Sequence, residues 1–171
     1  MKKIGIFCDS VNGKTVALSK KIASAFGIGN EDMHNVSEIT PENIESYGIL
    51  LLGTSTGCEG NWHDDWEKAV EILKNMNLTG KTIALFGCGK SQPDGSISCT
   101  GIDKLYNELK QTGATLIGEL SPDKGSAGTL SEEKKERLPG LAIDEADDDE
   151  TNEMLVDQWT RTLNYNFNSH L

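Results

Sequence analysis

Short, continuously apolar runs recur along this chain, and helical patterns separate them. The runs lie at residues 3–8, 48–53, 81–87, 115–120 and 140–143. A run that is apolar without alternation predicts a strand buried on both faces, because a solvated face would require polar residues at every second position. Such strands, alternating with helices, predict a parallel sheet that is covered by helices on both sides.

The intervals between these runs carry helical patterns and one weaker strand candidate. Residues 32–36 form that candidate, and Thr40 followed by Pro41 is typical of an N-cap and first turn, which predicts a short helix through Ile44. Longer amphipathic patterns predict four further helices, at residues 15–26, 64–76, 102–112 and 152–164. The polar, glycine-rich segment 121–139 is expected to be an excursion from the last strand, within a single domain spanning residues 1–171.

The charge of the chain limits its partners. The 171 residues carry a formal net charge of −11, with acidic residues concentrated at 144–150 (DEADDDE). This balance argues against nucleic acids and anionic membranes as partners, because both are polyanions. It permits docking to a basic protein surface, and a solvated acidic face that keeps the chain in solution is the alternative.

The apolar runs and the cysteines indicate the cellular compartment in which the protein is expected. The longest apolar runs are far shorter than a membrane span, and the opening residues do not resemble a signal peptide, so we expect a cytoplasmic protein. The four cysteines, which form no C-x-x-C pair, are expected to be reduced thiols. Cys8 and Cys88 are expected to be small core residues, and Cys58 is expected to be the exposed thiol.

Three polar loops follow predicted strands, at residues 9–15, 54–61 and 87–96. In an open α/β sheet, ligands bind beyond the carboxyl ends of the strands. The three loops are rich in glycine and short polar residues, which permit close approach of the backbone to a ligand. They therefore form the candidate binding site.

The first loop, within the stretch FCDSVNGKT at residues 7–15, lies close to two phosphate-binding motifs but matches neither. A triphosphate loop would need glycine in place of Cys8 and an acidic metal ligand after a neighbouring strand. A cysteine phosphatase would need arginine in place of Lys14, and Asp9 opposes formation of the thiolate. A nest of backbone N–H groups that holds one phosphate monoester without metal fits better, and an ordinary strand–helix turn is the alternative.

Several motifs taken together resemble the flavodoxin family, in its long-chain type. Residues 10–15 (SVNGKT) match the family's Ser/Thr-x-Thr-Gly-x-Thr loop except at Asn12. Further matching stretches are LLLGTSTGCEG at 50–60, DDW at 64–66, ALFGCG at 84–89, LPGLAIDE at 138–145 and the closing amphipathic helix. The resemblance covers nearly the whole chain. It implies a flavodoxin-like three-layer α/β/α sandwich with a five-stranded parallel sheet in the order 2-1-3-4-5, whose fifth strand is interrupted at 121–139.

The resemblance also implies a function. Its cofactor would be flavin mononucleotide (FMN), bound without a covalent bond and used as a low-potential one-electron carrier between redox proteins with basic docking patches. Such a monomeric protein transfers electrons and is not a catalyst in its own right, so no catalytic or metal-binding residue is expected. Two alternatives remain: a binding or regulatory protein of the same fold with weak or no flavin binding, and a flavin or quinone reductase, for which no nicotinamide site is evident.

The resemblance assigns cofactor-binding residues in all three loops. The phosphate would be held by the first loop, at Ser10, Val11, Asn12, Gly13, Lys14 and Thr15. The ribityl chain and the ring would be contacted by the second loop, at Thr54, Ser55, Thr56, Gly57, Cys58, Glu59 and Gly60. The Cys58–Glu59 peptide would lie beside flavin N5, where its carbonyl can face the proton of the one-electron-reduced ring. The third loop would contribute Cys88, Gly89 and Asp94.

Two positions depart from the family pattern. Gly57 and Asp94 stand where family members usually stack a tryptophan and a tyrosine on the flavin. By analogy with base stacking, each aromatic is worth roughly 1–3 kcal/mol, so losing both lowers affinity by about two to four orders of magnitude. Trp62 is the candidate for one replacement, and a tryptophan packed at the start of a helix is the alternative.

Overall fold

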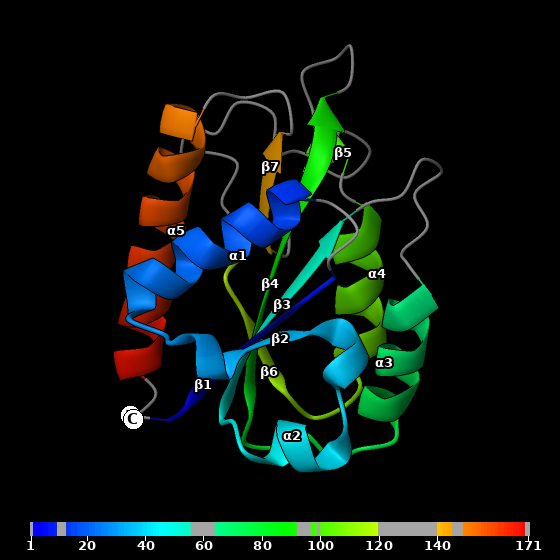
Figure 1. Cartoon of the computed structure of the whole chain (residues 1–171). Coiled ribbons are helices and arrows are strands. Elements are labelled where there is room, and N and C mark those ends of the chain that lie inside the picture. Colours follow the sequence, from blue (N-terminus) through cyan, green and yellow to red (C-terminus); the bar gives the residue numbers. More distant parts are fainter. Residues whose placement is uncertain are drawn as a thin grey trace.

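The computed structural model describes residues 2–9, 13–55, 64–91, 97–98, 100–119, 140–144 and 149–169. Its strands are β1 (Ile4–Cys8), β2 (Met33–Asn35), β3 (Ile49–Ser55), β4 (Thr82–Ser91), β5 (Ile97–Ser98), β6 (Thr115–Ile117) and β7 (Gly140–Asp144). Its helices are α1 (Gly13–Phe26), α2 (Pro41–Glu45), α3 (Asp64–Lys74), α4 (Thr100–Leu109) and α5 (Asp149–Ser169), with two short 3₁₀ turns at Asn30–Asp32 and Val36–Glu38. Helices α1 and α5 cover one face of the sheet, and α3 and α4 cover the other (Figure 1).

The predicted strand order is confirmed. Strands β2, β1, β3 and β4 are parallel neighbours in that order, and the fifth position is filled by β6 and β7, which both pair in parallel with β4. β6 pairs with residues 82–84 and β7 with residues 85–89, so the two pieces follow one another along the same edge of β4. The predicted excursion at 121–139 lies outside the described residues.

The predicted end of the fourth strand is wrong. The sequence indicates a loop from Gly87, but β4 continues to Ser91 and then pairs antiparallel with β5, as Lys90 with Ser98. The composition of residues 87–91 (GCGKS) is typical of a turn. Strand pairing outweighs this turn-like composition, because β4 is paired with β3 as far as Cys88 and with β7 as far as Gly89.

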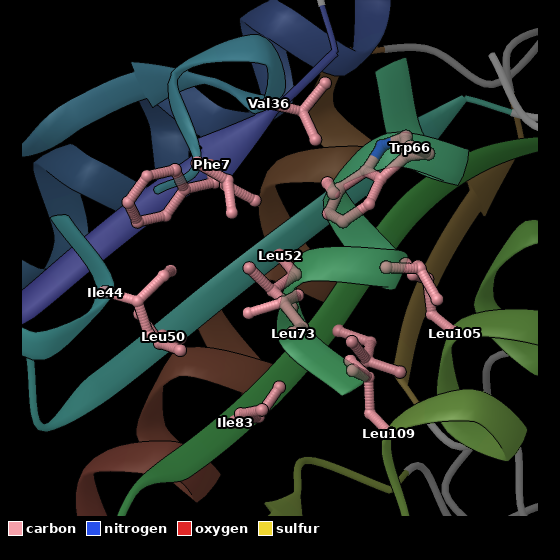
Figure 2. Packing of buried hydrophobic residues seen from close by; sticks show 14 of the residues in the cluster. Phe7, Val36, Ile44, Leu50, Leu52, Trp66, Leu73, Ile83, Leu105 and Leu109 are labelled. Carbon is pink, nitrogen blue, oxygen red and sulfur yellow. The ribbon is translucent and has the colours of Figure 1, made fainter. Parts of the chain in front are cut away.

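The sheet separates two apolar clusters, because successive side chains of a strand point to opposite faces. Leu50 and Leu52 of β3 face α3 and α4, whereas Leu51 faces α1 and α5, and all three are fully buried. Figure 2 shows the first cluster, in which labelled side chains of the strands and of both helices gather, among them Phe7, Leu52, Trp66, Leu73, Leu105 and Leu109. The prediction of strands buried on both faces is therefore confirmed for β3.

A polar cluster ties the edge strand β2 to the rest of the sheet. The Tyr47 hydroxyl donates to Asp32 Oδ1 (3.0 Å), which also receives Lys3 Nζ (2.9 Å). Because the hydroxyl has one proton, His34 Nε2 is the donor in its 2.7 Å hydrogen bond to Tyr47. Burial, followed by the hydrogen bond and charge of Asp32, raises the pKa of Tyr47 to about 12. The Tyr47 ring lies against Gly5, where an added Cβ would come within 2.8 Å of it.

We expect Tyr47→Phe to destabilise the fold by about 1–2 kcal/mol, because it removes two hydrogen bonds while keeping the ring over Gly5. Urea unfolding of the cofactor-free protein measures this. The control is Tyr165→Phe on α5, whose side chain is mostly exposed and whose replacement should change stability by less than about 0.5 kcal/mol. Equal losses in the two variants would contradict the role given to Tyr47.

The same cluster predicts a pH dependence. The hydrogen bond from Lys3 lowers the pKa of Asp32. A carboxylate with a lowered folded-state pKa stabilises the fold above its unfolded pKa of about 3.9 and loses this contribution as the pH falls through the folded value. The stability difference between the wild type and Asp32→Asn should therefore be largest near neutrality and shrink below about pH 4. Urea unfolding across this range tests it, with the exposed Asp157→Asn, a weak ion-pair partner of Arg161, as a control that should differ little.

Candidate functional site

The carboxyl ends of the three central strands lie side by side. Cys8 at the end of β1 pairs with Gly53 of β3, and Ser55 at the end of β3 pairs with Cys88 of β4. The chain segments that leave these positions therefore begin at the same edge of the sheet. The structure brings the starts of the three predicted loops together, although residues 10–12, 56–63 and 92–96 lie outside the described residues.

The start of α1 contains an unsatisfied buried hydroxyl. Thr15 is fully buried, and its Oγ1 has no hydrogen-bond partner among the residues that the structure describes. An unpaired buried hydroxyl is unfavourable by about 1–3 kcal/mol. Gly13, at the first position of the helix, has open space where a Cβ would be. The first backbone N–H groups of a helix also lack partners within the helix and carry a partial positive charge. The arrangement suits an anion that reaches the Thr15 hydroxyl.

The thiol at the end of β1 is unsuited to nucleophilic chemistry. Burial, with a smaller contribution from the Asp9 carboxylate, raises the pKa of Cys8, and a hydrogen bond with Ser19 opposes this only in part. Asp9 is itself almost fully buried. Reactive cysteines require the opposite environment, one that favours the thiolate. The structure therefore gives no support to the cysteine phosphatase alternative.

The described part of the second loop is its beginning. Thr54 is fully buried, and a Cβ added to Gly101 at the start of α4 would lie 2.9 Å from its Cγ2 and 3.0 Å from its Oγ1. The Thr54 side chain is thus packed against the start of α4. Ser55 ends β3, and the remaining predicted residues of this loop, among them Trp62, lie outside the described residues.

Of the residues predicted in the third loop, two lie in β4. The Cys88 side chain is fully buried in the cluster beneath α1 and α5, which confirms the expectation that Cys8 and Cys88 are core residues. Gly89 pairs with Asp144 of β7. The predicted Asp94 lies outside the described residues.

Nothing in the sequence pattern distinguishes Asn152 or the indole of Trp66 from neighbouring residues of their helices. Asn152, in the first turns of α5, is almost fully buried, and its Oδ1 has no hydrogen-bond partner among the described residues. The sequence pattern places Trp66 in the apolar stripe of its helix. In the structure its Nε1 also donates a hydrogen bond to the Gly53 carbonyl, at 3.1 Å. A helical pattern identifies such residues as buried but does not show which polar atom they present.

Acidic residues surround this edge of the sheet. The first turn of α3 holds Asp64, Asp65 and Glu67, and the first turns of α5 expose Glu150 and Glu153. Acidic side chains stabilise helix N-termini through the helix dipole. Within the described ranges, no group of three His, Cys, Asp or Glu residues is arranged to hold a metal ion, and no helix is both long and apolar enough to cross a membrane.

These features define a doubly wound α/β protein with a candidate anion site where the order of its strands reverses, between β1 and β3. The family model described as Flavodoxin matches residues 6–159 of the chain. The chain belongs to the flavodoxin family, as the sequence motifs predicted.

Individual relatives agree with this membership. The flavodoxin of Buchnera aphidicola subsp. Baizongia pistaciae is 33% identical over 174 aligned residues, which cover 100% of this chain and 99% of the relative. Flavodoxin 1 of Escherichia coli K12 is 30% identical over 164 residues, covering 93% and 91% of the two chains. Among solved structures, Fusobacterium nucleatum flavodoxin bound to flavin mononucleotide superimposes with a TM-score of 0.80 at 27% identity, covering 97% of this chain and 99% of that one.

Burial predicts that Cys8 and Cys88 resist modification in the native protein. We expect a thiol reagent to leave both unmodified under conditions in which an exposed cysteine reacts completely, because both side chains are buried and burial also raises the pKa of Cys8. Peptide mapping by mass spectrometry measures the labelling. Unfolding in guanidinium is the control and should make all four cysteines reactive. Rapid labelling of Cys8 in the folded chain would contradict this account.

Proposed function

We propose that this protein is a flavodoxin in function as well as in family: a low-potential one-electron carrier that binds FMN without a covalent bond. The observation that carries the proposal is the Thr15 hydroxyl, which is buried and unpartnered at the start of α1. It lies in the sequence SVNGKT, where the family binds its cofactor phosphate. The residues present fit FMN, because a phosphate oxygen would supply the acceptor that this hydroxyl lacks.

In the proposed site, the first loop and the start of α1 bind the phosphate. Backbone N–H groups of residues 10–15 and the Thr15 hydroxyl donate to phosphate oxygens, and the positive end of the α1 dipole stabilises the negative charge. No metal is proposed, because a nest of backbone N–H groups at a helix N-terminus can hold one phosphate monoester without it. This arrangement anchors the cofactor but leaves its ring chemistry to the other two loops.

The ring and ribityl chain are assigned to the second and third loops. Residues 54–60 would hold one side of the ring, with the Cys58–Glu59 peptide near flavin N5, and Gly89 and Asp94 would hold the other. Trp62 is proposed to replace the stacking aromatic that is missing at Gly57. When bound, FMN supplies reversible one-electron chemistry. The chain would bind and orient the ring and limit its contact with water, and the Cys58–Glu59 peptide would offer its carbonyl to a proton on flavin N5.

The acidic surface is proposed to have two effects. Negative charge around the carboxyl edge, from α3, α5 and the proposed site residue Glu59, disfavours additional negative charge on the ring and so lowers its reduction potential. It also favours docking to redox proteins with basic patches. The proposal includes the long-chain subtype, a monomeric state and a cytoplasmic location. The division of the fifth strand into β6 and β7 supports the subtype.

Purification and titration with FMN test the proposal. A yellow protein with about one flavin per chain, or a colourless one that takes up FMN at micromolar concentration, supports the carrier. Protein that fails to take up FMN would instead favour a binding or regulatory protein, the alternative motivated by the absence of aromatic residues at Gly57 and Asp94. Stepwise reduction of the loaded protein then shows whether electrons enter one at a time.

We expect Thr15→Val to weaken FMN binding by about 10- to 100-fold while leaving the cofactor-free protein equally stable or more stable. The variant removes the Thr15 hydroxyl. In the cofactor-free protein this hydroxyl is unpaired, and in the proposed complex it donates a hydrogen bond to a charged phosphate oxygen. Riboflavin, which lacks the phosphate, should bind the variant and the wild type equally. Calorimetry and urea unfolding measure these effects.

Thr112→Val is the matched control for this substitution. Its hydroxyl is also buried but already donates to the Leu109 carbonyl at 2.6 Å, away from the candidate site. It should lower stability by about 1 kcal/mol without changing FMN affinity. A Thr15→Val variant that loses stability and retains its FMN affinity would show that Thr15 serves the fold alone.

A further inference from the structure

A side-chain hydrogen bond from α3 reaches β3 two residues before the strand ends. Gly53 is the last residue of β3 that pairs with β1, because β1 ends opposite it at Cys8. The Gly53 carbonyl accepts the indole Nε1–H of Trp66 at 3.1 Å, and the Trp66 side chain is fully buried. A side chain of α3 thus supplies a donor where the neighbouring strand stops. Trp66 is labelled in Figure 2, where it stands at one end of the apolar cluster.

Two further contacts hold the same short segment. The Phe86 ring of β4 lies directly against the Cα of Gly53, where no Cβ has room. The Thr54 side chain packs against Gly101 of α4. The strand end is therefore fixed by its neighbour β4, by α4 and by the indole of α3. Of these three, only the indole connects β3 to the helix on the far side of the second loop.

We propose that Trp66 is a positioning residue for the flavin site, acting through the Gly53 carbonyl. The bond joins β3, at the residue before Thr54, to the third residue of α3. It thereby holds the end of β3 and the start of α3 together, and residues 56–63 connect these two ends in the sequence. Fixing them sets the separation that the connecting residues of the second loop must span. The inference rests on the proposed function, since it assumes that the second loop contacts the flavin.

The chain contains a matched control on the opposite face of the sheet. Trp159 of α5 is also fully buried, and its Nε1 donates to the Gly118 carbonyl at 2.9 Å. Gly118 lies just after β6, and none of the three candidate loops follows that strand. The two tryptophans thus share residue type, burial and the kind of bond, and differ in the segment that the bond holds.

The test compares Trp66→Phe with Trp159→Phe. Both substitutions should lower the unfolding stability of the cofactor-free protein to a similar degree, because each removes one hydrogen bond and leaves a space beside the smaller ring. Trp66→Phe alone should weaken FMN binding, by about tenfold, and weaken riboflavin binding by the same factor, because its effect falls on the ring and not on the phosphate. It alone should also shift the visible absorption bands of bound FMN, which report the surroundings of the ring.

The outcomes separate this inference from the proposed function. Wild-type protein that fails to bind FMN would refute the proposed function before the variants are compared. Wild-type protein that binds FMN, together with a Trp66→Phe variant whose affinity and spectrum match those of Trp159→Phe, would refute the positioning role. If Trp66→Phe does not fold, benzothienylalanine at position 66 keeps the shape of the indole and removes its N–H. The same weakening and spectral shift are then expected of that protein, and their absence counts against the inference.

Discussion

The parallel pairing of β3 with β4 is the constraint on which the rest of the structure depends. Seven consecutive residues of β3 pair with β4, and the side chains of Leu50, Leu51 and Leu52 are withdrawn from water on both faces. Burial of this kind contributes roughly 25 cal/mol per Å² of apolar surface, and it is available only if helices cover both sides. The two helical layers, the two clusters and the alignment of the strand ends follow from this pairing. A binding site at the carboxyl edge is a consequence of the same geometry, because the paired strands deliver their loops to one place.

Much of this architecture could be predicted from the sequence, because the apolar runs of the central strands leave few alternatives. The runs GILLLG and TIALFG specify buried strands, and Thr40 with Pro41 specifies the start of α2, where Thr40 Oγ1 accepts the Asn43 N–H. The extension of β4 to Ser91 could not be predicted. Residues 87–91 have the composition of a turn, and only their pairing makes them a strand: residues 87–89 pair with β3 or β7, and residues 90–91 pair with β5.

The candidate site was predictable to a smaller extent. The order of the strands places the starts of the three loops together, and the pattern around Gly13 and Thr15 indicates a phosphate. However, sequence alone does not show that the Thr15 hydroxyl lacks a partner while the Thr112 hydroxyl has one, since both are threonines in helical surroundings. Nor does it distinguish Trp66 as a hydrogen-bond donor from Trp66 as an apolar residue. Such differences depend on which acceptor lies within about 3 Å in the folded chain, a distance that spacing along the sequence does not determine.

The division of the fifth strand has an evolutionary consequence. β6 and β7 each pair with their own residues of β4, so the ladder at this position does not require one continuous strand. The chain between them is therefore free to change in length and composition without disturbing the hydrogen-bonded ladder. Doubling the length of such a connection raises the entropic cost of closing it by only about 0.6 kcal/mol. This connection is a point at which new recognition elements can be inserted or removed over generations while the ancestral scaffold stays intact.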